Sequence, residues 1–295
     1  MFDKVLIANR GEIAVRINRA CQELGISTVA IHSEADADSM HVRIADESVC
    51  IGPNPVNKSY LNAHAIISAC EITGAQAVHP GYGFLSENAS FAKMLDDHKL
   101  TFIGPKHKHI SMMGDKIEAK KIMQEYGVPT VPGSKGAVAD LKDALKTSKD
   151  IGFPVLLKAS AGGGGRGMKV VNDEKELTDA LPIIKQEALS FFGNDSIYIE
   201  KFIDSPRHIE IQVICDSHNN FLHLHERDCS IQRRNQKVIE EALAPEIDQA
   251  KKEKLFKICI DAMAKMGYLG LGTLEFLFAD NEFYFMEMNT RLQVE

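Results

Sequence analysis

A glycine-rich stretch between two short apolar runs holds the first residues that could do chemistry. The run 154–157 leads to Lys158, four successive glycines follow at 162–165 beside Arg166, and a second apolar run covers 168–171. Glycine loses more conformational entropy on ordering than any other residue, so a purely structural turn would use fewer glycines. Backbone N–H groups without Cβ atoms bind anions, and the two cations suit phosphate oxygens. The stretch predicts a mobile lid over a nucleotide, with a flexible hairpin tip as the alternative.

Two glutamates in the last predicted hairpin form the second group. Strands at 273–279 and 283–288 would flank a three-residue loop at 280–282, which places Glu275 opposite Glu287. Facing carboxylates repel unless a cation lies between them, and such oxygen ligands suit Mg²⁺ or Mn²⁺. With a two-residue loop the pair would fall on opposite faces, and the argument for a metal would be lost. In an extended chain, alternation would place on one face Glu287, Asn289, Arg291, Gln293 and Glu295.

The elements that position these residues begin with alternating strands and helices. Strands are predicted at 4–8, 28–32, 48–51, 77–78 and 101–103, with helices at 12–24, 61–73 and 88–95. This alternation predicts a doubly wound parallel sheet in an α/β protein. The loops 79–83 and 86–88 follow strand ends, where ligands bind in such sheets.

The rest of the chain divides into three further segments after an α/β domain at 1–104. A helical linker is predicted at 105–130, with its helix from 110 to 128, and a small lid domain at 131–203. The lid would contain helices at 140–149 and 174–191 and a strand at 197–203. A last domain at 204–295 would contain strands at 208–215 and 221–227, a helix at 248–266 and the closing hairpin. Two interpretations of Glu200 and Lys201 stay open. The two charged residues could form buried ion pairs, or they could bind the edge of a nucleotide at a hinge. The charged segment 226–237 is predicted to be too polar for a core.

Composition bounds the class of protein. With 295 residues, 44% hydrophobic and 25% charged, the chain is typical of a soluble globular protein with several domains. A net charge of -7 without a large basic block argues against a nucleic-acid partner. The sequence has no signal pattern and no apolar run of about 18 residues, so we expect a cytoplasmic protein without a membrane span. The six scattered cysteines predict reduced thiols.

Six motifs in order resemble the biotin carboxylase family of ATP-grasp enzymes, which form a subunit of acetyl-CoA carboxylase. They are NRGEIAVR, HPGYGFLSEN, MGDK, KASAGGGGRGM, ERDCSIQRRNQK and EFYFMEMNTRLQVE, and together they cover the whole chain. The resemblance implies an ATP-grasp fold after the first domain, with a glycine-hairpin lid and an incomplete antiparallel C-terminal domain. It also implies ATP-dependent carboxylation of biotin on a biotin carboxyl carrier protein, with bicarbonate as carbon source, as the first half-reaction of acetyl-CoA carboxylase in fatty acid synthesis.

The resemblance also implies site residues. ATP would be contacted by Lys116, Lys158, Gly164, Gly165, Glu200, Lys201, Ile203, His208, Gln232 and Asn235. Two divalent ions would be held by Glu275, Glu287 and Asn289. Bicarbonate would be bound by Lys237, Arg291, Gln293 and Val294, with Glu295 as the base and with Lys237 and Arg291 as the other catalytic residues. In the family's mechanism ATP activates bicarbonate as carboxyphosphate, whose breakdown delivers CO₂ next to biotin.

Partners and alternatives follow from the same resemblance. Expected partners are the carrier protein, carboxyltransferase subunits and, at full length, a second copy of the chain. Related domains in propionyl-CoA and pyruvate carboxylases leave the downstream substrate open. Another ATP-grasp ligase, such as a carbamoyl-phosphate or purine-pathway synthase, is disfavoured by ERDCSIQRR followed by Lys237. An inactive nucleotide-binding fragment is the non-enzymatic alternative.

Two features of the sequence depart from the family pattern. Asn235 stands where many members carry a histidine near the ribose. Members also continue well beyond the position of Glu295, to an arginine that stabilises the biotin enolate. From the sequence we therefore expect the 295-residue chain by itself to bind ATP weakly, to carboxylate biotin negligibly and to tend to aggregate.

Overall fold

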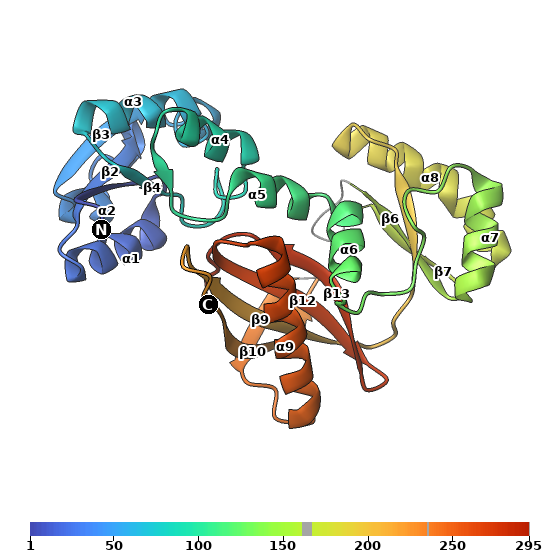
Figure 1. Cartoon of the computed structure of the whole chain (residues 1–295). Helices are drawn as coiled ribbons and strands as arrows, with labels where there is room; N and C mark the ends of the chain where they lie inside the picture. Colours follow the sequence, from blue (N-terminus) through green and yellow to red (C-terminus); the bar gives the residue numbers. More distant parts are fainter. Residues whose placement is uncertain (161–166, 235, 295) are drawn as a thin grey trace.

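A parallel sheet forms the first domain. The computed structural model describes residues 1–160, 167–234 and 236–294 (Figure 1). The first domain contains β1 (Lys4–Ile7), α1 (Gly11–Glu23), β2 (Ser27–Ser33), η1 (Glu34–Asp36), α2 (Met40–Ile44), β3 (Glu47–Gly52), η2 (Val56–Lys58), α3 (Ala63–Thr73), β4 (Ala77–His79), α4 (Ala89–Asp97) and β5 (Thr101–Phe102). All its strands are parallel, in the order β3-β2-β1-β4-β5, which confirms the predicted doubly wound sheet.

The local sequence explains these elements. The apolar run of β1 is buried on both faces, as expected for a parallel strand covered by helices on each side. Asn62 and Asn88 cap α3 and α4, because each side chain accepts a hydrogen bond from a backbone N–H in the first turn. The strand order reverses between β1 and β4, and this places the loops after both strands at one edge of the sheet.

Two helices, rather than the single one predicted at 110–128, follow the first domain. They are α5 (His107–Gly114) and α6 (Lys116–Glu125), separated by Asp115. Asp115 has an extended backbone, and its carboxylate accepts hydrogen bonds from the N–H groups of Ile117 and Glu118. The prediction was wrong because an aspartate inside an otherwise helical pattern can also act as an N-cap. The break allows α6 to pack against the C-terminal sheet.

The lid is an antiparallel sheet covered by helices on one face. It contains α7 (Leu141–Ile151), β6 (Val155–Ala159), β7 (Met168–Val171), α8 (Glu174–Phe192) and β8 (Ile197–Lys201), with the strand order β7-β6-β8. Val155, Leu157 and Ile199 pack with α7 and α8 in the lid core. Strands β6 and β7 therefore flank the glycine-rich stretch as predicted, while the residues 161–166 between them lie outside the described residues.

The C-terminal part is a second antiparallel sheet. It contains β9 (Arg207–Cys215), β10 (Phe221–Arg233), β11 (Gln236–Ala242), α9 (Gln249–Met266), β12 (Gly270–Ala279) and β13 (Glu282–Asn289), in the order β11-β10-β9-β12-β13. Helix α9 covers one face, where Phe256, Cys259 and Met263 join the core with β9 residues. In Figure 1 this sheet lies between the first domain and the lid, below α5 and α6.

The charged segment 226–237 belongs to this sheet, contrary to prediction. Strand β10 continues to Arg233, and β11 was not predicted at all. Glu226 and Asp228 are buried because cations reach them: Lys252 donates to Glu226 at 2.9 Å, and Arg207 donates to Asp228. Polar density alone did not reveal these pairings, since both partners lie far away in the sequence.

The closing hairpin reaches the predicted pairing by a different route. The loop has two residues, Asp280 and Asn281, at φ 49° and 64°, a left-handed conformation that these residue types tolerate. The predicted three-residue loop is therefore wrong. A bulge between Glu275 and Phe276 shifts the register by one residue, so that Glu275 still pairs with Glu287.

The strand predicted to continue toward 295 ends at Asn289. Residues 290–294 are irregular, and Glu295 lies outside the described residues. None of the helices in the described part of the chain has the length and apolar content needed to cross a bilayer.

Candidate active site

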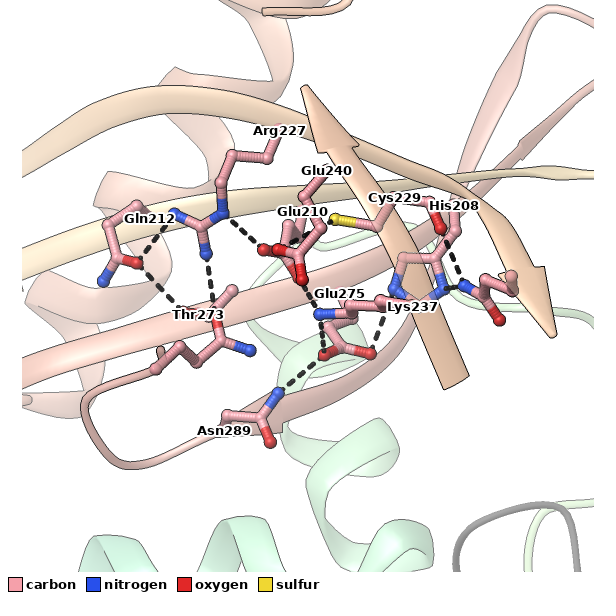
Figure 2. Close-up of polar contacts among 12 residues, drawn as sticks. His208, Glu210, Gln212, Arg227, Cys229, Lys237, Glu240, Thr273, Glu275 and Asn289 are labelled. Atoms are coloured by element: carbon pink, nitrogen blue, oxygen red, sulfur yellow. Dashed lines mark hydrogen bonds and ion pairs between the residues drawn. The ribbon is translucent and has the colours of Figure 1, made fainter. Parts of the chain in front are cut away.

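The face of the C-terminal sheet that points away from α9 carries a cluster of polar side chains. On β9, His208, Glu210 and Gln212 alternate with core residues of the opposite face. Neighbouring strands contribute Arg227, Cys229, Lys237, Glu240, Thr273, Glu275 and Asn289 (Figure 2). Because adjacent strands bring these residues together, the cluster is set by sheet register rather than by one loop.

Glu210 lies at the centre of this cluster. Its carboxylate is fully buried, accepts a hydrogen bond from Arg227 Nε at 2.5 Å and contacts the Lys237 ammonium group. Arg227 also donates to Gln212 at 3.0 Å and to Gln293 at 2.7 Å. The buried charge of Glu210 is thus compensated by two cations, and Gln293 joins the site through Arg227 although the strand has already ended.

Glu275 is the second anionic centre. Lys237 Nζ lies 3.2 Å and His208 Nε2 3.1 Å from its carboxylate, and Asn289 Nδ2 donates to it at 2.7 Å. Burial by itself raises the pKa of Glu275, but the contacts with His208 and Lys237 outweigh burial and lower the pKa to about 2. Burial also lowers the pKa of Lys237, whereas Glu275 and Glu210 raise it above the usual range. Both groups are therefore charged at neutral pH.

The acidity of Glu275 predicts how stability depends on pH. Because the folded pKa of about 2 lies below the ordinary 4.5, ionised Glu275 stabilises the fold above pH 4.5, and this contribution is lost as the pH falls toward 2. A shift of this size corresponds to on the order of 3 kcal/mol. We expect urea unfolding at neutral pH and at about pH 3 to show a smaller acid loss in Glu275→Gln than in the parent chain. Equal acid losses in both proteins would contradict the charge network; Glu282→Gln, on the exposed hairpin end, is the control.

The carboxylates of Glu275 and Glu287 can hold a divalent ion. They form a cross-strand pair, and hard oxygen donors of this kind suit Mg²⁺ or Mn²⁺. Each carboxylate has a lysine partner, since Lys116 Nζ lies 3.0 Å from Glu287 Oε2 and Lys237 contacts Glu275. His208, Glu210 and Glu275 also bring possible ligand atoms within 4.8 Å of one another. The Glu210 side chain is fully buried, whereas those of Glu275 and Glu287 are 7% and 35% exposed, so the pair of Glu275 and Glu287 is the more accessible to an ion.

A second cluster lies where α6 meets the open face of the lid sheet. Lys158 Nζ lies 2.6 Å from Glu200 Oε2, and Lys120 contacts the other oxygen of the same carboxylate, which is almost fully buried. Burial lowers the pKa of both lysines, repulsion from Lys116 adds to that effect, and Glu287 opposes it. These two ion pairs favour the buried-pair interpretation of Glu200. They also place the Glu200 carboxylate beside Lys158, at the base of the glycine loop.

The other residues implied by the resemblance lie at varying distances from these clusters. The Lys201 side chain donates to the backbone oxygens of Gly152 and Phe153, within the lid itself. Ile203 lies in the connection between β8 and β9, and Val294 is exposed. Gln232 donates to the Cys229 carbonyl at 2.9 Å and lies 3.0 Å from His208 Nδ1. Gly164, Gly165, Asn235 and Glu295 lie outside the described residues.

Arg291 links the site to the first domain. Its Nε donates to Glu87 at 3.0 Å, and its Nη2 donates to Asn289 at 3.2 Å. Glu87 belongs to the loop 86–88, which the sequence had marked as a ligand-binding position. The first domain thus touches the same edge of the C-terminal sheet as the predicted metal ligands.

The site residues missed from the sequence include Lys120, Glu210 and Arg227. The signal for Glu210 was present, because His208, Glu210 and Gln212 alternate with apolar residues in one strand. Lys120 follows Lys116 by one helical turn, which places both on the same side of α6. Arg227 gave no local signal, because its partners come from other strands.

A first α/β domain, a glycine-hairpin lid and an antiparallel sheet with paired carboxylates define a protein of the ATP-grasp class. Two family models match the chain: Biotin carboxylase, N-terminal domain, over residues 1–110, and Carbamoyl-phosphate synthase L chain, ATP binding domain, over 115–295. The chain belongs to the biotin carboxylase family.

Similar proteins include biotin carboxylases and propionyl-CoA carboxylase alpha chains. The biotin carboxylase of Pseudomonas aeruginosa is 56% identical over all of this chain and 66% of its own length. The mitochondrial propionyl-CoA carboxylase alpha chain of Mus musculus is 54% identical over all of this chain and 41% of its own length. This chain therefore spans about two thirds, or less, of these curated relatives.

Two solved structures share the whole fold of the chain. The biotin carboxylase complex with β,γ-ATP from Campylobacter jejuni has a TM-score of 0.95 at 50% identity, covering all of this chain and 66% of that one. The biotin carboxylase domain dimer of Hydrogenobacter thermophilus 2-oxoglutarate carboxylase, with MgADP, ADP and bicarbonate, has a TM-score of 0.93 at 49% identity, covering all of this chain and 65% of that one.

Proposed function

We propose that this chain carries the nucleotide, metal and bicarbonate groups for ATP-dependent carboxylation of biotin. The observation that carries the proposal is the position of the buried Glu275 carboxylate, which lies opposite Glu287 and in contact with Lys237, His208 and Asn289. A phosphoryl-transfer site needs carboxylates for divalent ions next to cations for phosphate oxygens. The two clusters supply both, and Lys116 connects them through Glu287.

On the nucleotide side, we assign ATP binding to the lid and α6. Lys116 and Lys158 would neutralise phosphate charge, and the glycine loop with Gly164 and Gly165 would close over the phosphates. Glu200, Lys201, Ile203, His208, Gln232 and Asn235 would complete the nucleotide pocket. Bound Mg²⁺ or Mn²⁺, held by Glu275, Glu287 and Asn289, would neutralise charge on the transferring phosphoryl group.

On the bicarbonate side, we assign binding to Lys237, Arg291, Gln293 and Val294. Lys237 and Arg227 bring positive charge to this part of the sheet, and Gln293 is held there by Arg227. Such charge suits a small anion and the carboxyphosphate formed from it. Glu295 would take the proton from bicarbonate. The structure of the Hydrogenobacter thermophilus domain with MgADP and bicarbonate supports the choice of these two kinds of ligand.

The biological setting is a further part of the proposal. We infer a biotin carboxyl carrier protein and carboxyltransferase subunits as partners, a homodimer as the assembly, and the cytoplasm as the location. Acetyl-CoA carboxylation in fatty acid synthesis is our first choice. Propionyl-CoA carboxylation is the second candidate, because propionyl-CoA carboxylase alpha chains match at similar identity.

The proposed function predicts which substrates govern ATP use. In the protein that carries these 295 residues, ATP hydrolysis should be slow with MgATP alone and should rise when bicarbonate and biotin are both present. A carbamoyl-phosphate synthase would respond to ammonia instead. An ATPase rate that does not change when biotin and bicarbonate are added would contradict the proposed carboxylation, but it would not contradict the proposed nucleotide site.

A further inference from the structure

Three lysines surround two glutamates where α6, the lid sheet and β13 meet. Lys116 and Lys120 come from successive turns of α6, and Lys158 comes from the end of β6. Leu156 pairs with Glu200 and Lys158 with Tyr198, which places Lys158 diagonally across from Glu200 on one sheet face. Lys116 is occupied by Glu287. The carboxylate of Glu200 therefore forms its ion pairs with Lys120 and Lys158.

Two ammonium groups on one carboxylate exceed what Glu200 needs for charge balance. The three lysines contribute +3 and the two glutamates −2, so the cluster carries a net charge of +1 when all five groups are ionised. The side chains of Lys120 and Lys158 are each only 13% exposed. Excess positive charge held away from water favours an anionic ligand.

The two lysines differ in how they are held. Lys120 lies over the Tyr198 ring, with Nζ 5.4 Å from the ring centre, in addition to its contact with Glu200. This position gives its charge two stabilising partners. Lys158 lies near the end of β6, next to the glycine loop. Its ammonium group forms an ion pair with Glu200, and in the described part of the chain no aromatic ring lies beneath it as Tyr198 lies beneath Lys120. Of the two, Lys158 is the one placed to exchange partners.

We propose that Lys120 is a positioning residue that keeps Glu200 neutralised, so that Lys158 can leave Glu200 and bind a nucleotide phosphate. The inference rests on the proposed nucleotide site. If Lys120 were absent, departure of Lys158 would leave a buried carboxylate without a cation, which is strongly unfavourable. Lys158 would then stay with Glu200, and the nucleotide phosphates would lose their contact with the Lys158 ammonium group.

A double-mutant cycle on MgADP affinity tests this exchange, with binding measured by titration calorimetry. Lys120→Met should weaken MgADP binding by about tenfold or more, while Lys120→Arg should preserve it. Glu200→Gln removes the carboxylate that needs compensation. In the double variant, Lys120→Met should therefore cost little beyond the effect of Glu200→Gln alone. Lys121→Met, the exposed neighbour on α6, is the matched control and should bind as the parent does.

The possible outcomes separate the mechanisms. If Lys120→Met weakens binding equally in the parent chain and in the Glu200→Gln background, Lys120 contacts the nucleotide directly, and the positioning role is wrong. Unchanged affinity in Lys120→Met would overturn the inference while leaving the nucleotide site intact. A parent chain that does not bind MgADP would overturn the proposed nucleotide site and this inference together. Unfolding midpoints of all variants show whether a loss of binding reflects a loss of fold.

Discussion

Glu210→Ala should lower the free energy of unfolding by about 3–5 kcal/mol, the largest stability effect expected in this chain. The Glu210 carboxylate is fully buried and compensates both Arg227 and Lys237, whose side chains are 15% and 19% exposed. Removing it leaves two largely buried cations with less negative charge than they need. Urea unfolding with matched slopes measures the change.

The control for this prediction is Glu241→Ala, at an exposed position of β11. Substitution there should change the free energy of unfolding by no more than about 0.5 kcal/mol. If Glu210→Ala cost less than about 1 kcal/mol, the Glu210 network would contribute little to folding. The network would then matter only for the chemistry at this face of the sheet.

Lys237→Met should lower turnover of bicarbonate-dependent ATP hydrolysis by roughly 100- to 1,000-fold. Lys237 lies between the two buried carboxylates and is the cation shared by the proposed bicarbonate and metal groups. Charge that develops on the reacting phosphoryl and carboxyl groups is stabilised by a fixed cation in a site shielded from water. We expect the loss mainly in kcat, with a smaller rise in KM for bicarbonate.

Lys254→Met, on the exposed face of α9, is the matched control and should leave both constants unchanged. Lys237→Met also removes one partner of Glu210, so assays belong well below the unfolding midpoint of the variant. A full turnover rate in Lys237→Met would show that the cation serves stability alone.

Local patterns were enough to predict most of the fold. Alternating strands and helices gave the doubly wound sheet, because β1 and β2 contain short apolar runs and α1 has an apolar stripe. They were not enough at Asp115, where the same residue type suits a helix interior poorly but an N-cap well. Strand β11 was missed because both its faces carry polar residues, which no periodicity distinguishes from a loop.

The site was predicted in part for similar reasons. The pairing of Glu275 with Glu287 is correct, but only because a bulge offsets a turn that is one residue shorter than expected. Neither the bulge nor the turn length can be derived from side-chain alternation. Glu210, Arg227 and Lys120 depend on partners that lie between 15 and 80 residues away, on different elements. Such partners become visible only when the sheet register is known.

The central claim is that this site carboxylates biotin at the expense of ATP. Transfer of ¹⁴C from labelled bicarbonate to biotin, by the protein that carries these residues, tests it most directly. The account predicts labelled carboxybiotin that forms only with MgATP, in proportion to the ADP released, and that is lost in Lys237→Met. ATP consumption without label in biotin, or label that forms in the absence of ATP, would contradict it.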